Sequence, residues 1–141
     1  MTIQCFYTRL SPKEHRFQVE RPPHPPIDIR LETRSMLLHD FCHHAVESEL
    51  ETPAGFFGLL AAGWSLEALR HDALSEEIRD PLMEIERHVV MLQTHFKQGP
   101  TDLLGSKTLR ATWGAWNAAK TGQRLVLTWP GSEPVVQTIE R

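Results

Sequence analysis

The chain has 141 residues, of which 40% are hydrophobic and 23% are charged, and its formal net charge is −3 at pH 7. This length is typical of one domain, and it allows a hydrophobic core large enough to fold without disulfide bonds or a structural metal. The mild negative charge gives no basic surface of the kind that nucleic acids or anionic membranes attract. We therefore expect no nucleic acid and no membrane among its partners.

Two cysteines, Cys5 and Cys42, are too few for the disulfide framework that stabilises small secreted domains. No apolar stretch of signal-peptide length follows the N-terminus. The longest apolar run, residues 55–64, is about half the ~20 residues that a membrane-spanning helix needs. These features predict a cytoplasmic protein, and we expect a bacterial one.

The first third of the chain is predicted to form strands. Side-chain character alternates over residues 3–7 and again over residues 17–19, with a Ser-Pro turn at residues 11–12 between them, which predicts a hairpin. The proline-rich residues 21–26 predict an extended connection. Residues 27–31 resume the alternation and are expected to form a third strand.

From Thr33 the hydrophobic spacing changes to that of a helix, which we expect to run to about Leu50. Thr33 or Ser35 is available as its N-cap. Residues 56–62 are apolar on every side and predict a short buried helix or turn.

The remainder predicts two more helices and a hairpin. Asp80-Pro81 combines a capping residue with a proline at the first helical position, so a helix is expected from there to about Lys97. Another should span about residues 107–120, and residues 124–136 should form a terminal hairpin. Together the patterns predict an α+β fold in a single domain, residues 1–141. A small antiparallel sheet from the N- and C-terminal hairpins would pack against about four helices.

One helical segment carries residues that suggest chemistry. At 100° per residue, His39, His43 and Glu47 fall on one side of the predicted helix, with Asp40 beside them. The i, i+4 spacing places the two imidazoles one above the other, where they can share a metal ion. This is also the spacing of the H-E-x-x-H zinc helix, in which the Glu acts on a metal-bound water.

We therefore predict that His39 and His43 are ligands of zinc or another divalent metal. Asp40 would be the general base or an acceptor beside the metal, although its side chain is one methylene shorter than that of Glu. Glu47 lies about 12 Å along the helix from His39, given a rise of about 1.5 Å per residue. Glu47 is therefore expected to orient His43 rather than to bind the same ion.

A catalytic zinc site uses three protein ligands, so a third must come from another segment. His88 and His95 share a flank of the next predicted helix, seven residues apart, and His88 is our predicted third ligand. His44 and His71 are weaker candidates. A homodimer is compatible with such a site.

Two alternatives stay open. The polar helix face and the apolar residues 56–64 could form the dimer or partner surface of a non-catalytic interaction module without a metal site. Alternatively, the two His-Asp doublets suggest a phosphohydrolase of the HD type, with its metal site assembled from His39, His71, Asp72 and Asp102. Proteins of that type are helical throughout, whereas this chain has predicted strands at both ends.

Three stretches, LETRS at residues 31–35, HDxxHxxVE at residues 39–47 and GFFGLLAAG at residues 55–63, resemble a group of small uncharacterised bacterial proteins. That resemblance implies no activity. Residues 39–43 are also loosely similar to the H-E-x-x-H motif of zinc metallohydrolases, with Asp40 where that motif has Glu. The sequence thus favours a divalent-metal-binding protein and a metal-dependent hydrolase. No motif identifies its substrate, whether a small molecule or a peptide.

Overall fold

The computed structural model describes residues 2–69, 73–99, 102–131 and 133–139, and within them it has one five-stranded antiparallel sheet and four helices. The predicted α+β class is confirmed. The elements in chain order are β1 (Ile3–Arg9), β2 (Glu14–Glu20), β3 (Ile27–Glu32), α1 (Thr33–Leu50), α2 (Phe56–Ala61), α3 (Glu76–Phe96), α4 (Ser106–Ala118), β4 (Gln123–Trp129) and β5 (Val135–Thr138).

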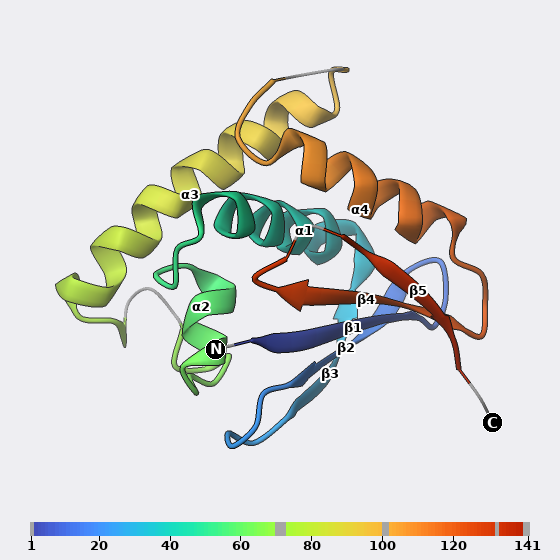
Figure 1. Ribbon diagram of the computed structural model, residues 1–141, viewed down its shortest axis with the longest axis horizontal. Helices are drawn as coiled ribbons and strands as arrows, with labels where there is room; N and C mark the ends of the chain where they lie inside the picture. Colours follow the sequence, from blue (N-terminus) through green and yellow to red (C-terminus); the bar gives the residue numbers. More distant parts are fainter. Residues whose placement is uncertain (1, 70–72, 100–101, 132, 140–141) are drawn as a thin grey trace.

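The two predicted hairpins join into one sheet with the strand order β3-β2-β1-β4-β5. Strand β1 is central, with Cys5 opposite Val19 of β2 and Leu127 of β4. Because successive side chains of a strand point to opposite faces, these three residues share one face, and all three are buried. This face carries the helices (Figure 1).

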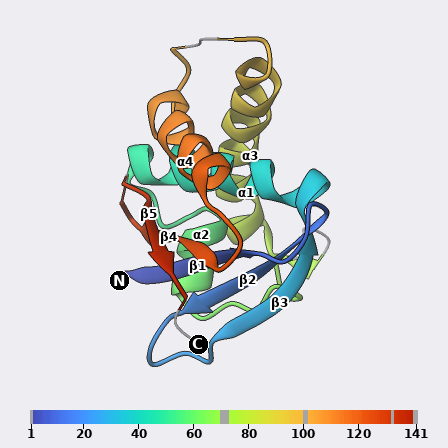
Figure 2. The same cartoon turned by 90° about the vertical axis from the view of Figure 1, so that its right-hand side faces the viewer.

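Helix α1 lies between the sheet and the helices α3 and α4, as two perpendicular views show (Figures 1 and 2). It is therefore covered on more than one side. Phe41 and Cys42 are buried in the main core, and the polar His43, His44 and Glu47 are buried as well. A helix enclosed in this way has no broad solvated face, so the polar side predicted from the sequence lies inside the protein.

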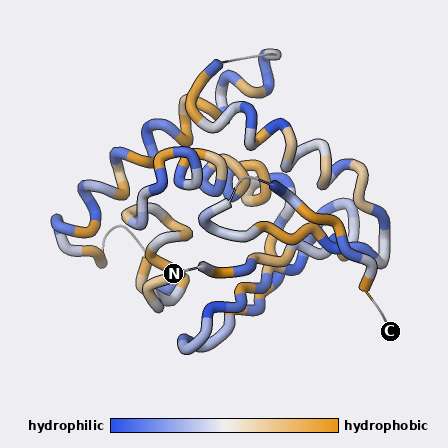
Figure 3. Tube along the Cα trace, in the orientation of Figure 1, coloured by the Kyte–Doolittle hydropathy of each residue, from blue (hydrophilic) through white to orange (hydrophobic). Residues whose placement is uncertain are grey.

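Helix α3 is more exposed, and hydrophilic stretches alternate with hydrophobic ones along it (Figure 3). Its buried residues are Leu82, Ile85, Val89 and Leu92. The predicted start was wrong: the helix begins at Glu76, with Ser75 at the N-cap position, so Pro81 lies inside it. The two glutamates of the first turn, Glu76 and Glu77, favour this earlier start because negative charge stabilises a helix N-terminus.

The N-cap residue of α1 also differs from the prediction. Glu32, the last residue of β3, occupies the N-cap position without a side-chain cap, so neither Thr33 nor Ser35 is the cap. The chain passes from strand to helix without a loop, and the Thr33 N–H donates to the carbonyl of Lys13 instead. The Thr33 hydroxyl lies 3.1 Å from His15 Nδ1 and joins the helix to β2.

Helix α2 confirms the predicted short buried helix. Phe57 and Leu60 are fully buried, and Phe56 is half-buried. Gly58 allows α2 to approach the preceding loop closely, because a Cβ atom there would lie 2.2 Å from the carbonyl oxygen of Pro53. This burial counts against the apolar residues 56–64 as an exposed partner surface.

None of the helices in the described part of the chain combines the length and the apolar character needed to cross a membrane.

Candidate metal centre

Two histidines of α1 and one glutamate of α3 bring their ligand atoms together. One atom from each of His39, His43 and Glu86 lies within 4.8 Å of the other two. His43 Nε2 is 3.0 Å from Glu86 Oε1, and His39 Nε2 is 3.6 Å from Glu86 Oε2. The two imidazole rings are neighbours, with centroids 4.9 Å apart. Both Nε2 atoms therefore face the same carboxylate.

The opposite nitrogens of both rings have other partners. His39 Nδ1 lies 2.9 Å from Gln93 Oε1 on α3, and His43 Nδ1 lies 3.0 Å from Glu47 Oε2. In a neutral imidazole, an oxygen acceptor at Nδ1 favours the tautomer that carries its proton there, so Nε2 is the nitrogen whose lone pair can bind a metal ion. Metal-binding histidines are oriented in this way by acceptors behind them.

Glu47 is held in place on its other side by α2. Its carboxylate is fully buried, and Oε1 accepts hydrogen bonds from the backbone N–H groups of Phe57 at 2.9 Å and Gly58 at 3.1 Å. Gly55 provides the space for this carboxylate, because a Cβ atom at Gly55 would lie 2.2 Å from Glu47 Cδ. Glu47 thus links His43 to the first turn of α2.

The charges around His43 are coupled. Burial by itself would lower the pKa of His43, but hydrogen bonds to Glu47 and Glu86 outweigh it and raise that pKa to about 9. Burial also raises the pKa of Glu47, against the hydrogen bonds that it accepts from His43 and the two backbone N–H groups. Without a metal ion, His43 is therefore an imidazolium between two carboxyl groups.

A cavity of about 340 Å³ adjoins the cluster. Its polar lining residues are His39, Asp40, His43 and Glu86, and its apolar ones are Phe17, Leu31, Met36, Phe56, Leu66 and Leu69. Asp40 is buried, and among the described residues no hydrogen-bond partner is found for it. Burial raises the pKa of Asp40 to about 7, against the nearby charge of His43. A carboxyl group of this kind is available to a ligand.

The structure brings together His39, His43 and Asp40 as the sequence suggested, but it does not add His88. Glu86, two residues earlier on α3, takes the place that we had assigned to His88. Two residues turn a helix by about 200°, so these side chains point to nearly opposite sides of α3. No recognisable motif surrounds Glu86. Its only sequence signal is that it directly follows Ile85, one of the buried apolar residues of α3.

The weaker candidates lie elsewhere. His95 Nδ1 lies 2.9 Å from the carbonyl oxygen of Met91, and His44 Nε2 lies 3.0 Å from that of Thr128. Asp102 is exposed. His71 and Asp72, on which the phosphohydrolase alternative depends, lie outside the described residues.

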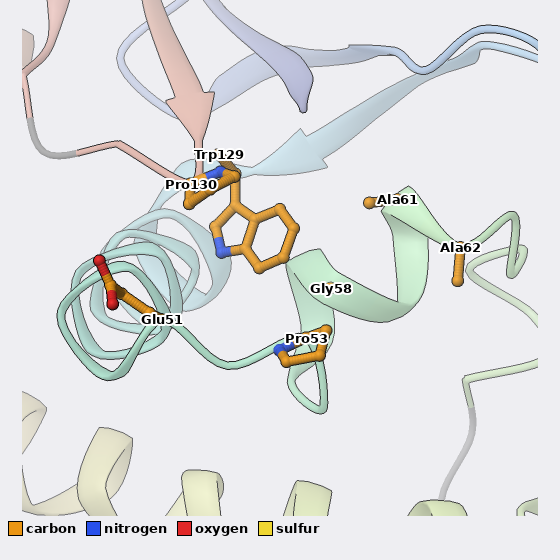
Figure 4. Close-up of a pocket in the computed structure, with 7 residues that line it drawn as sticks. All are labelled: Glu51, Pro53, Gly58, Ala61, Ala62, Trp129 and Pro130. Carbon is orange, nitrogen blue, oxygen red and sulfur yellow. The ribbon is translucent and has the colours of Figure 1, made fainter. Parts of the chain in front are cut away.

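A second cavity, of about 320 Å³, lies on another side of α2 (Figure 4). Trp129 and Pro130 at the end of β4 form one wall, and Pro53 and residues of α2 form the other. Glu51 is the one titratable residue among its described lining. Of these two cavities, the one beside the histidines has the larger set of titratable side chains.

No protein-family model, no curated protein and no solved structure matches this chain. Two histidines and one carboxylate are the ligand set of several catalytic zinc sites and of non-haem iron(II) sites, which leave positions open for water or substrate.

Proposed function

We propose that this protein binds one divalent metal ion, with zinc as the first candidate, through His39 Nε2, His43 Nε2 and the Glu86 carboxylate. The observation that carries the proposal is the convergence of these three ligand atoms within 4.8 Å. Ligands about 2.1 Å from a tetrahedral zinc ion lie roughly 3.4 Å apart. The 3.0 and 3.6 Å distances to Glu86 are close to that spacing, so only small side-chain movements are needed.

The charges around His43 favour replacement of its Nε2 proton by a metal ion. The imidazolium proton on Nε2 now lies between His43 and Glu86, the position that a cation would take. In the metal-bound protein, His43 would give up that proton, and the two carboxylates would stabilise the charge of the ion in its place. Glu47 keeps its hydrogen bond to Nδ1 in both states and so acts as a positioning residue.

We propose metal-dependent hydrolysis as the reaction. A bound divalent ion supplies Lewis-acid chemistry, lowering the pKa of a water molecule or polarising a substrate carbonyl. Asp40 lines the same cavity and has no hydrogen-bond partner among the described residues, which suits it to accept the proton of the attacking water. The shorter reach of Asp compared with Glu matters less here, because the cavity lies beside the carboxyl group itself.

A non-catalytic interaction module is the second candidate. The apolar side chains of Met83, Val90 and Met91 are exposed on α3, and they favour it as a surface for a partner or a second copy of the chain. This alternative requires no metal ion, so metal content separates the two proposals.

The decisive experiment is elemental analysis of protein purified without a histidine tag. We expect about one zinc, iron or manganese ion per chain in the wild type, and its loss in His39→Ala/His43→Ala and in Glu86→Gln. The matched control His88→Ala/His95→Ala also removes two histidines and should retain the metal. Circular dichroism would check that each variant is folded.

Absence of metal from the wild type, even after incubation with zinc, would refute the metal site and leave the interaction module. Retention of metal by a folded Glu86→Gln variant together with its loss from the control would return the third ligand to His88.

A further inference from the structure

The cavity beside the metal cluster has a lining of two kinds. Six of its ten lining residues are apolar, and they come from β2, β3, α1, α2 and the segment that follows α2. The other four are the titratable residues of the proposed site, all from α1 and α3. A ligand that fills this cavity must therefore place most of its surface against hydrocarbon and aromatic side chains, with one polar group near the histidines.

The charges around the cavity disfavour an anionic ligand. Asp40 and Glu86 line the cavity, and Glu47 lies directly behind His43. Among the described residues that line the cavity there is no lysine or arginine to balance a second negative charge. A carboxylate or phosphate at the apolar end of a ligand would lose its hydration without gaining a cation in return.

The volume limits the size of the ligand. At about 30 Å³ for each water-sized group, a cavity of about 340 Å³ holds on the order of ten non-hydrogen atoms. Resting on the proposed metal site, we infer that the substrate is a small uncharged compound of about this size, with an apolar body and one polar reacting group. An ester or amide of a short aliphatic or aromatic acid has this chemistry.

Hydroxamic acids test this inference on the metal-loaded protein, because their common end group binds the metal and their tails can be varied. Isothermal titration would compare acetohydroxamic acid, hexanohydroxamic acid and adipic monohydroxamic acid, which adds a carboxylate to the six-carbon tail. Each methylene that leaves water strengthens binding up to about fourfold. We expect hexanohydroxamic acid to bind at least about tenfold more tightly than either of the other two.

Two matched lysine variants test whether the tail lies in this cavity. Met36 lines the cavity and is 39% exposed, whereas Met91 on α3 is 49% exposed and lies outside it. Met36→Lys should reduce the preference for the uncharged tail severalfold by supplying a cation. Met91→Lys should leave that preference unchanged. Equal binding of the charged and uncharged tails by the wild-type protein would overturn the inference.

A measurement without metal separates this inference from the metal site itself. Spectra of protein with ¹³C-labelled methionine methyl groups would be recorded during titration with hexanamide and with adipic acid monoamide, which adds a carboxylate to the far end of the same tail, both in the presence of a chelator. The inference predicts that hexanamide shifts the Met36 signal, with the Met91 signal unmoved, and that the monoamide with the charged tail shifts neither. A Met36 shift with the charged tail as large as with hexanamide would refute the inference, even if elemental analysis had established the metal site. If these titrations give the predicted pattern but elemental analysis finds no metal in the wild-type protein, the metal site alone is refuted.

Discussion

His43 and His44 are neighbours in the sequence and both are buried, but they lie in opposite surroundings. His43 lies between the carboxyl groups of Glu47 and Glu86, which raise its pKa to about 9 against the effect of burial. His44 faces the end of β4, where burial lowers its pKa and one backbone carbonyl, that of Thr128, opposes this only in part. Burial alone therefore does not determine the charge of a histidine. The polar groups contributed by neighbouring elements do.

The comparison extends to the elements around the two residues. On the His43 side, α3 and α2 supply carboxylates, amides and a cavity. On the side of the sheet, His15 is buried beside Tyr7 and Trp116, and its pKa is lowered to about 4 by burial. One side of α1 is thus built to hold charge, and the other holds neutral side chains.

The largest predicted effect is the difference between the unfolding free energies lost in His43→Leu and in His44→Leu. His43→Leu leaves the fully buried Glu47 without its cationic partner, which costs about 3–5 kcal/mol of unfolding free energy. His44→Leu removes one hydrogen bond to a backbone carbonyl and also the unpartnered Nδ1, so its cost should be about 1 kcal/mol. Urea unfolding at pH 7 with a chelator present measures both. Equal losses would show that the two sides of α1 do not differ in this way.

An intermediate effect is expected from Gly55→Ala. The new methyl group would lie 2.2 Å from Glu47 Cδ and must displace the carboxylate from the N–H groups of α2. We expect a loss of about 2–3 kcal/mol of unfolding free energy. Zinc affinity should fall about 10- to 100-fold, because His43 loses its orienting partner. Urea unfolding and competition with a zinc-binding dye measure these two quantities.

Gly114→Ala on α4 is the matched control for that substitution. Apart from its chain neighbours and the backbone of its own helix, no heavy atom of the described residues lies within 4 Å of a Cβ atom at Gly114. An alanine inside a helix stabilises it by up to about 1 kcal/mol relative to glycine. Unchanged zinc binding by Gly55→Ala would show that Glu47 does not position His43.

The smallest effect on the unfolding free energy is expected from lowering the pH. The pKa of His15 is about 4 in the folded protein, whereas its ordinary value, which applies to the unfolded chain, is 6.5. As the pH falls below 6.5, the unfolded chain therefore takes up a proton at His15 before the folded protein does. The corresponding stability is fully present above pH 6.5 and is lost as the pH falls toward 4; by pH 5 the loss amounts to about 2 kcal/mol. Urea midpoints between pH 7 and 4 follow this loss. The variant His15→Gln cannot take up the proton, and a loss as steep as that of the wild type would contradict the assignment to His15.

Local patterns predicted much of the fold. The bounds of α1, Thr33–Leu50, match the predicted helix, and both hairpins form where alternation and turn residues placed them. These features depend on neighbouring residues, whose spacing of about 3.6 or 2 is set by backbone geometry. The start of α3 was missed because Asp80-Pro81 matched the capping pattern, whereas the helix accommodates Pro81 in its second turn.

The sequence by itself determined that His39 and His43 share one side of α1, since a spacing of four residues is enough to align two side chains on a helix. It also determined the pairing of His43 with Glu47, for the same reason. Only the tertiary structure decided that Glu86 completes the cluster, that α2 holds Glu47, and that a cavity opens beside Asp40. Glu86 is 43 residues from His43 along the chain. Contacts over that distance depend on how α3 packs across α1, and no local spacing encodes the rotation of one helix against another.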